Sequence, residues 1–212
     1  MFLLVNLFSA AFAASFFGYS TVYDYNLLTI EWKPTDCLVE QCPSSYLSQN
    51  FNIHGLWPNN NDGTWPSYCN SHYDFSVNSQ TKAELEEYWR SYNGNPSSFW
   101  QHEWTKHGTC VTPAVDPDTY FQTTVSLFKK LDLLNTLKNN GITPDDNKQI
   151  NKNDIYNCFN NIININCKSK NGNEYFWNIQ LCYDHNFNQI DCQKEYTNCG
   201  YNFYFPSTSI DP

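Results

Sequence analysis

The chain has 212 residues, of which 41% are hydrophobic and 16% charged, and its formal net charge at pH 7 is −9. This length is enough for one large domain with a hydrophobic core, and the aromatic content of 17% indicates a core rich in aromatic side chains. The negative charge argues against a protein that coats nucleic acid through general electrostatic attraction. It leaves open a protein that grips a few nucleotides through positive charge confined to one site.

The N-terminal segment predicts a secretory signal peptide. Residues 2–12 are mostly apolar, and Ala11-Phe12-Ala13 resembles a small-x-small cleavage site, although no lysine or arginine precedes the apolar run. The alternative is an apolar N-terminal strand. We expect residues 1–14 to be removed and residues 15–212 to form the mature domain. No later run approaches the ~20 apolar residues of a membrane span, so the mature chain should not cross a membrane.

The first segments after the leader predict a strand and then a helix. Residues 23–32 alternate loosely and are rich in aromatic and β-branched side chains, which is typical of a strand. Thr81 and Glu84 resemble a capping box at a helix start. Apolar positions follow at helical spacing, and Asn93-Gly94 should end this helix.

The second half of the chain continues with helices and closes with strands. Asp116-Pro117 starts a helix that runs, with or without a break, to Asn140-Gly141. A polar stretch, residues 143–153, leads to a helix that carries Cys158. Strands are predicted around residues 162–167, 175–183 and 201–205. Helices in the middle and strands at both ends indicate an α+β domain.

A histidine stands out in residues 51–58, Phe-Asn-Ile-His-Gly-Leu-Trp-Pro. His54 lies in an otherwise apolar run, and by itself it would be interpreted as a buried, hydrogen-bonded core residue. The alternative is a catalytic role, since in-line transfer at phosphorus needs an acid and a base on opposite sides. A second histidine-containing segment favours the alternative.

That second segment is residues 99–110, Phe-Trp-Gln-His-Glu-Trp-Thr-Lys-His-Gly-Thr-Cys. Its polar side chains of interest are His102, Glu103, Lys106 and His107. In a helix at about 100° per residue, these four fall within an arc of roughly 140°. A solvated charged face would account for the Glu–Lys spacing but for neither the histidines nor the flanking aromatic residues. A helical zinc site needs H-E-x-x-H, whereas the spacing here is H-E-x-x-x-H. The pattern therefore predicts an acid–base site for a phosphate group.

The motifs I-H-G-L-W-P at residues 53–58 and H-E-W-T-K-H-G-T-C at residues 102–110 resemble the two active-site segments of the ribonuclease T2 family of acid endoribonucleases. They occur in the expected order, about fifty residues apart. The resemblance implies a single α+β domain with a central antiparallel sheet, packed helices and stabilising disulfides.

Nine cysteines in a chain with a leader indicate disulfides formed in an oxidising compartment, but sequence alone does not fix their pairing. The family resemblance implies the bridges Cys37–Cys42, Cys69–Cys110, Cys167–Cys199 and Cys182–Cys192. The second would tether the end of the catalytic helix to the loop after His54. Cys158 is left over. Its i+3 position on an apolar helical face predicts a buried free thiol, and the alternative is intermolecular pairing.

The same resemblance implies an endoribonuclease, both RNA lyase and hydrolase, that cleaves single-stranded RNA through a 2′,3′-cyclic phosphate. His107 would be the base on the ribose 2′-OH and His54 the acid for the leaving 5′-oxygen. Glu103 and Lys106 would stabilise the transition state, and His102 would help to hold the phosphate. Because the nucleophile belongs to the ribose, no metal or other cofactor is expected, and DNA should not be cleaved. Two histidines also predict a bell-shaped pH profile, with an optimum at about pH 4.5–6.

Candidates for contacts with the bases lie in or beside the same segments. Trp57, Trp65 and Phe99 could each stack on a base, a sequence-tolerant contact worth ~1–3 kcal/mol. Trp57 and Phe99 could also be core residues, whereas Trp65 lies in a polar loop. Asn59 is either a polar contact for a base edge or a turn former. We expect low base specificity.

A second hypothesis is a secreted, disulfide-rich binding or storage protein that kept this fold without activity. The presence of both histidines, Glu103 and Lys106 argues against it, since an inert relative is free to lose them. We expect a monomer that enters the secretory pathway and is secreted or reaches the lumen of a lysosome or vacuole.

Overall fold

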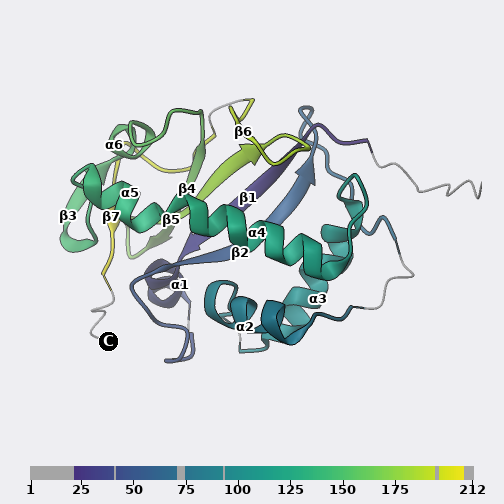
Figure 1. The fold of residues 1–212 in the computed structure, drawn as a ribbon. Coiled ribbons are helices and arrows are strands. Elements are labelled where there is room, and N and C mark those ends of the chain that lie inside the picture. Colours follow the sequence, from purple (N-terminus) through teal and green to yellow (C-terminus); the bar gives the residue numbers. More distant parts are fainter. Residues whose placement is uncertain (1–21, 41, 71–74, 93, 194–195, 208–212) are drawn as a thin grey trace, which may run out of the picture.

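A twisted sheet with helices packed against it is the centre of the protein, as the computed structural model shows (Figure 1). The structure describes residues 22–40, 42–70, 75–92, 94–193 and 196–207, so the expected signal peptide, residues 1–14, lies outside the described residues. The strands are β1 (Tyr25–Trp32), β2 (Phe51–Asn59), β3 (Asp145–Asn151), β4 (Asn164–Lys170), β5 (Asn173–Tyr183), β6 (Gln189–Ile190) and β7 (Asn202–Phe205). The helices are α1 (Lys33–Val39), α2 (Ser79–Tyr88), α3 (Pro96–Lys106), the short 3₁₀ helix η1 (Gly108–Cys110), α4 (Pro117–Leu131), α5 (Leu133–Asn139) and α6 (Lys152–Tyr156).

The sheet is mixed. Strand β1 lies between β2 and β5 and is antiparallel to both, and β4 and β6 are also antiparallel to β5. Strand β7 runs parallel to β5, which it meets where Tyr204 pairs with Tyr175, and β3 pairs with β7. The predicted α+β class with a central antiparallel sheet is confirmed, and the parallel pairing of β7 with β5 makes the sheet as a whole mixed. A parallel partner is allowed because β7 follows a long connection and not a hairpin.

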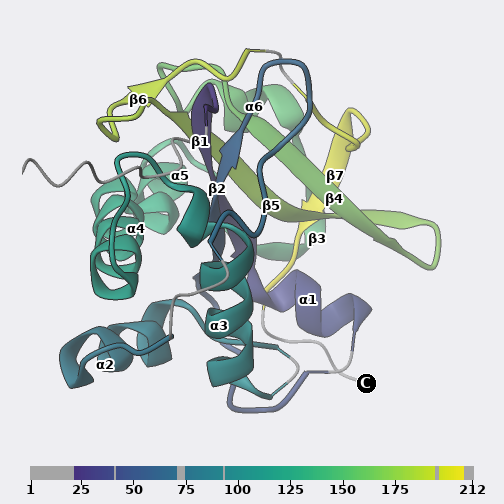
Figure 2. The ribbon, with the colours of Figure 1, turned by 90° about the vertical axis from the view of Figure 1, so that its right-hand side faces the viewer.

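The core lies between the sheet and the helices. Helices α4 and α5 cover one face of the sheet, and α2 and α3 lie near β2 (Figures 1 and 2). As the composition predicts, the core is aromatic: Trp32, Trp89, Trp100, Trp104 and Phe121 are among its largest fully buried side chains. None of the helices in the described ranges has the length and apolar character that crossing a membrane requires.

Helix α2 differs from its prediction at both ends. It begins at Ser79, and its N-cap is Asn78, whose side chain accepts a hydrogen bond from the Thr81 amide, so the predicted capping box at Thr81 is wrong. It ends at Tyr88, well before Asn93-Gly94. The cause is tertiary: the backbone amide of Arg90 donates to the Asn52 side chain at 2.7 Å, which draws the chain out of the helix toward β2.

The next helical region agrees more closely with the sequence. Asp116 caps α4 by accepting a hydrogen bond from the Thr119 amide, as expected for an Asp-Pro start. A break separates α4 from α5 at Asp132, which adopts a left-handed conformation with φ 41°.

Two expectations for the following segment are wrong. The polar stretch after residue 143 contains strand β3, whose mostly exposed side chains give no apolar alternation to detect. Cys158 is a free cysteine as expected, but it lies beyond the end of α6 and is only half-buried. The helical face proposed for it does not form, because Ile155 is buried whereas Ile162 is 46% exposed.

The four disulfides implied by the family resemblance are all present, namely Cys37–Cys42, Cys69–Cys110, Cys167–Cys199 and Cys182–Cys192. The bridge from Cys69 reaches Cys110, the last residue of η1 and of the segment 99–110. A backbone hydrogen bond from the Tyr68 amide to the Lys106 carbonyl at 2.9 Å supports the same contact. The loop after β2 is therefore attached to the end of α3.

The Cys69–Cys110 bridge should contribute strongly to stability. It joins residues 41 positions apart, and replacing both cysteines with serine should lower the free energy of unfolding by ~2–5 kcal/mol, because the unfolded chain gains freedom. Urea denaturation followed by tryptophan fluorescence measures this. Cys158→Ser is the matched control, since it removes a thiol that forms no bridge, and it should change stability by less than ~1 kcal/mol. A double variant as stable as this control would contradict the role assigned to the bridge.

Candidate active site

His54 lies at a β-bulge between β1 and β2. The register passes directly from the pair Ile30–Ile53 to the pair Thr29–Gly55, so His54 is the extra residue on β2. A bulge leaves one residue outside the ladder and changes the direction of its side chain. Alternation after the core residue Ile53 turns His54 to the opposite face, and the bulge then allows Leu56 to return to the core.

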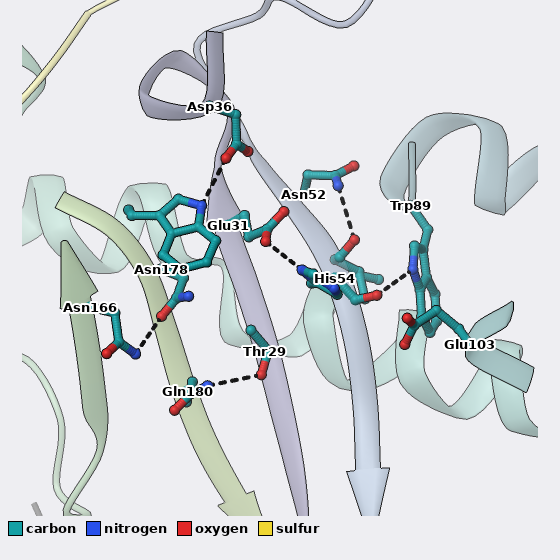
Figure 3. Close-up of polar contacts among 12 residues, drawn as sticks. Thr29, Glu31, Asp36, Asn52, His54, Trp89, Glu103, Asn166, Asn178 and Gln180 are labelled. Atoms are coloured by element: carbon teal, nitrogen blue, oxygen red, sulfur yellow. Dashed lines mark hydrogen bonds and ion pairs between the residues drawn. The ribbon is translucent and has the colours of Figure 1, made fainter. Parts of the chain in front are cut away.

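Side chains from two helices anchor β2 around the bulge. Trp89, the C-cap of α2, donates a hydrogen bond from Nε1 to the His54 carbonyl oxygen at 2.8 Å (Figure 3). Tyr120 of α4 donates its hydroxyl to the Leu56 carbonyl oxygen at 2.9 Å. Both donors belong to the buried aromatic core. The position of His54 is thus set by the core and not by a loop.

Helix α3 supplies the other segment. It ends at Lys106, and His107 is its C-cap with φ −116° and ψ −50°, so His107 lies outside the helix and the predicted arc does not describe it. Glu103 and His107 are buried, with exposed fractions of 2% and 7%. Lys106 is half-buried and His102 is exposed. The two histidines of this segment therefore occupy different environments.

Trp57 packs against both predicted catalytic histidines. Its ring centroid is 5.1 Å from that of His54 and 5.3 Å from that of His107. Its Nε1 donates a hydrogen bond to Glu103 Oε2 at 2.8 Å. Gly55 makes room for this contact, because a Cβ there would overlap both the indole nitrogen and the Glu103 oxygen. Trp57 thereby holds β2 against α3.

The two segments line one cavity of about 380 Å³. Its lining residues are Leu27, His54, Trp57, Asn59, Trp65, His102, Glu103, Lys106 and His107. The cavity therefore brings together all five residues predicted to be catalytic and three of the four predicted to contact the bases. Trp65 is 58% exposed at its edge, so its ring face is available to a ligand.

Phe99 does not lie in the cavity as the sequence predicted, whereas Leu27 lies there without having been predicted. Phe99 is half-buried and does not line this cavity; its ring packs edge-on against His54 at 5.6 Å. It packs against the histidine instead of lining the cavity. Leu27 of β1 also lines the cavity, and it is the residue that pairs with Trp57 in the sheet. The alternation of the predicted strand 23–32 could have indicated a residue on this face.

The sequence analysis also missed Glu31. This buried residue of β1 is 3% exposed, and its carboxylate forms a hydrogen bond and ion pair with Nδ1 of His54 (Figure 3). The available signal was a lone acid between Ile30 and Trp32, which predicts that the carboxylate needs a buried partner. Nothing in the sequence identified that partner as His54.

The two histidines have opposite pKa shifts. Burial alone would lower the pKa of His54, but the charge of Glu31 and the hydrogen bond with it outweigh burial and raise that pKa to about 9. Burial, reinforced by the positive charges of Lys106 and the other two histidines, lowers the pKa of His107 to about 3. Over a wide pH range His54 is therefore protonated and His107 neutral. One histidine can donate a proton while the other accepts one.

Glu103 and His102 are shifted as well. Burial raises the pKa of Glu103 to about 7, against the opposing effects of His54 and the hydrogen bond from Trp57. Glu103 is therefore mostly a neutral acid below this pH and can donate a hydrogen bond to an anion. Burial and the charge of Lys106 lower the pKa of His102, so its positive charge is confined to more acidic conditions.

The described residues contain no group of three or more histidine, cysteine, aspartate or glutamate side chains arranged to hold a metal ion. His102 lies on α3, whereas His107 follows the end of that helix, so the two do not form the helical histidine pair of an H-E-x-x-H zinc site.

Fold and site together define a disulfide-linked α+β protein with a cavity that pairs a proton donor with a proton acceptor. The ribonuclease T2 family model matches residues 23–192. The chain belongs to this family and is a T2-type ribonuclease.

Individual relatives can be aligned with this chain over most of its length. Ribonuclease 1 of Arabidopsis thaliana is 31% identical over 220 residues, covering 96% of this chain and 94% of its own. Ribonuclease DdI of Dictyostelium discoideum is 32% identical, with 88% and 86% covered. Among solved structures, RNase NT in complex with 5′-AMP has a TM-score of 0.76 at 29% identity, covering 87% of this chain and 98% of its own. Ribonuclease MC1 from the seeds of bitter gourd has a TM-score of 0.77 at 27% identity, covering 86% and 100%.

The raised pKa of His54 should make stability depend on pH. A histidine with a folded-state pKa of about 9 and an unfolded value near ~6.5 stabilises the folded state fully below pH ~6.5, and this contribution is lost as the pH rises through 9. We expect the free energy of unfolding to fall by ~0.5–1 kcal/mol between pH 7 and 8. Urea denaturation at the two pH values measures the change.

The pH window and a control variant separate the contribution of His54 to this pH dependence from that of other groups. Glu103, with its pKa of about 7, contributes mainly below the window, and Lys33, whose burial lowers its pKa to about 8, acts in the opposite direction above it. His54→Gln should remove the fall in stability. The matched control His185→Gln changes a histidine outside the cavity and should retain it. An equal fall in both variants would assign the effect to another group.

Proposed function

We propose that this ribonuclease cleaves single-stranded RNA by transphosphorylation with two histidines. His107 takes the proton from the ribose 2′-OH, and the 2′-oxygen then attacks the adjacent phosphorus. The bond from phosphorus to the 5′-oxygen breaks, and His54 protonates that leaving oxygen. The product is a 2′,3′-cyclic phosphate, which the same residues with exchanged roles hydrolyse more slowly. The observation that supports this most is that His54 and His107 line one cavity and that both rings lie close to the Trp57 ring.

The neighbouring polar residues suit a phosphate that gains negative charge. Lys106 lines the cavity and can stabilise the extra charge of the phosphorane-like transition state. Glu103, whose pKa lies at about 7, is neutral in acid and can donate a hydrogen bond to a phosphate oxygen instead of repelling it. His102 is exposed at the edge of the cavity and would help to hold the phosphate when protonated.

The nucleophile comes from the substrate, so the reaction as proposed uses neither a metal nor another cofactor. Activation of the 2′-oxygen needs only the base, and charge stabilisation needs only Lys106, Glu103 and His102. DNA has no 2′-OH and would not react by this route.

The base of the attacked nucleotide would lie against Trp65 and Trp57, with Leu27 beneath it and Asn59 at its edge, because these residues line the rest of the cavity. Stacking tolerates every base, so low base specificity is expected. The solved relative RNase NT was obtained in complex with 5′-AMP, in line with a cavity of this kind that accepts a nucleotide.

The cellular setting is also part of the proposal. Two relatives from Solanum lycopersicum are called extracellular ribonuclease LE and intracellular ribonuclease LX. We propose that residues 1–14 are a signal peptide and that the mature domain, residues 15–212, acts as a monomer. It would be secreted or held in the lumen of a lysosome or vacuole. The alternative is an inactive binding or storage protein. Absence of RNA cleavage in the tests below would favour this alternative.

The histidine roles predict the pH dependence of activity. In wild-type protein, kcat/KM should be bell-shaped, falling in acid as His107 becomes protonated and in alkali as His54 loses its proton. The pKa values of about 3 and about 9 make the bell wider than the sequence suggested, although the expected optimum of about pH 4.5–6 lies inside it. His107→Phe and His54→Phe should each lower turnover at least ~100-fold.

His185→Phe is the control for these variants, because His185 lies outside the cavity and contacts the Tyr23 backbone. It should retain nearly full turnover. Near-wild-type turnover in the His54 or His107 variant would remove that residue from the mechanism, and a rate that does not vary with pH would contradict the acid–base pair itself.

The identity of the nucleophile gives a separate test. Single-stranded RNA incubated with the protein in excess EDTA should be cut, with a 2′,3′-cyclic phosphate end detectable by ³¹P NMR. DNA of the same sequence should stay intact, because it cannot supply the attacking oxygen. A hybrid DNA strand with a single ribonucleotide sharpens the test, since cleavage should occur only after that residue. Loss of RNA cleavage in EDTA, restored by zinc, would return the site to a metal mechanism.

A further inference from the structure

Glu31 has no role in the mechanism just described, yet it makes the direct ionic contact with His54. Its carboxylate meets Nδ1 of the imidazole, and the pair is both a hydrogen bond and an ion pair. The side chain of Glu31 is 5% exposed and that of His54 29%. The carboxylate is therefore shielded from water, while the imidazole reaches the cavity. An ion pair in such surroundings is screened much less than a surface pair.

The sheet positions Glu31 for this contact. Ile30 and Trp32, its neighbours along β1, are fully buried in the core, and strand alternation turns Glu31 to the other face. On β2, Glu31 pairs with Asn52, and His54 is two residues further on, at the bulge. Residues two apart on a strand share a face. The register therefore puts the histidine on the same face as the carboxylate.

The contact determines which nitrogen of His54 is available for chemistry. With its proton on Nδ1 shared with Glu31, the ring can exchange a proton only at Nε2, on the opposite side of the imidazole. A neighbouring carboxylate also favours the charged imidazolium. The acid proposed for the leaving oxygen needs both properties: a fixed tautomer and a proton on Nε2.

We propose that Glu31 is a positioning residue for RNA cleavage: its carboxylate keeps His54 protonated with Nε2 directed to the substrate, and so sets the alkaline limit of activity. This inference rests on the proposed function, in which His54 is the general acid. Glu31 does not touch the reacting atoms and acts only through the imidazole.

Other ionisable groups around His54 do not substitute for Glu31. Asp36 of α1 and Glu103 of α3 are the other acids that influence it, and His102 and His107 oppose its charge. Asp36 is occupied by Lys168 Nζ at 3.0 Å, Trp177 Nε1 at 2.7 Å and Tyr46 at 3.1 Å. Glu103 accepts from Trp57. Glu31 is the acid recorded in contact with the imidazole.

The test is Glu31→Gln, which can keep the hydrogen bond but removes the charge. The His54 pKa is read from imidazole signals in NMR titrations, assigned by the signal that disappears in His54→Gln. We expect this pKa to fall by at least about one unit, and the alkaline limb of kcat/KM to move to lower pH by the same amount. At pH 5, where His54 stays protonated in both proteins, turnover should remain within about threefold of wild type.

Glu40→Gln is the matched control. It makes the same change at an exposed carboxylate that binds Lys168, and it should leave both the His54 pKa and the alkaline limb unchanged. Glu31→Asp is the second variant. It keeps the charge on a shorter side chain, so its His54 pKa should lie between those of wild type and Glu31→Gln, and it serves if the glutamine variant does not fold.

The NMR and kinetic results separate failure of this inference from failure of the proposed function. An unchanged His54 pKa in the glutamine variant, or an aspartate variant no better than glutamine, would overturn the role of Glu31. A lowered pKa with an unmoved alkaline limb would instead show that His54 is not the acid, and would overturn the kinetic role of Glu31 together with the proposed mechanism. Parallel shifts in both measurements support the inference.

Discussion

The close approach of β2 to α3 at Gly55 is the constraint on which the site depends. With no side chain at this position, the Trp57 indole reaches Glu103 and joins the two segments that line the cavity. His54 and His107 both pack against this one aromatic ring. A similar constraint acts at Gly108, where a Cβ would overlap the buried Trp104 ring. Each catalytic segment therefore contains a glycine that permits tight packing, and the spacing of the site follows from the core.

The sequence could predict the parts of this structure that local patterns encode. Periodicity located β1, α4 and the catalytic helix, and the two motifs located the cavity and its catalytic candidates. Family resemblance supplied the four disulfides. Strand β3 could not be found in this way, because its exposed polar side chains carry no alternation and its partner β7 lies about fifty residues away.

What the sequence could not supply were features made by tertiary contacts. The end of α2 is decided by a hydrogen bond between Arg90 and Asn52, and the pairing of Glu31 with His54 depends on the register of β1 against β2. The helical wheel also placed His107 on α3, whereas it is the cap of that helix. Its φ of −116° turns the side chain toward the cavity by a geometry that a regular helix does not have.

The acidity of the protein is compatible with a polyanionic substrate because several of its carboxyl groups are buried. Burial raises the pKa of Asp36 to about 6 and that of Glu103 to about 7. Both groups lose their charge in mildly acidic solution, and the surroundings of the cavity become less negative there. The cavity can therefore bind a phosphate although the chain has a net charge of −9 and no basic surface is needed.

The Cys69–Cys110 bridge has a consequence for the conditions under which the cavity stays ordered. The bridge attaches the loop after β2 to the end of the catalytic helix, and it persists only where thiols are kept oxidised. Under reducing conditions, such as those of a glutathione pool, an opened bridge would free the helix end that carries His107. The redox state of the surroundings would then decide whether the two sides of the cavity stay in register.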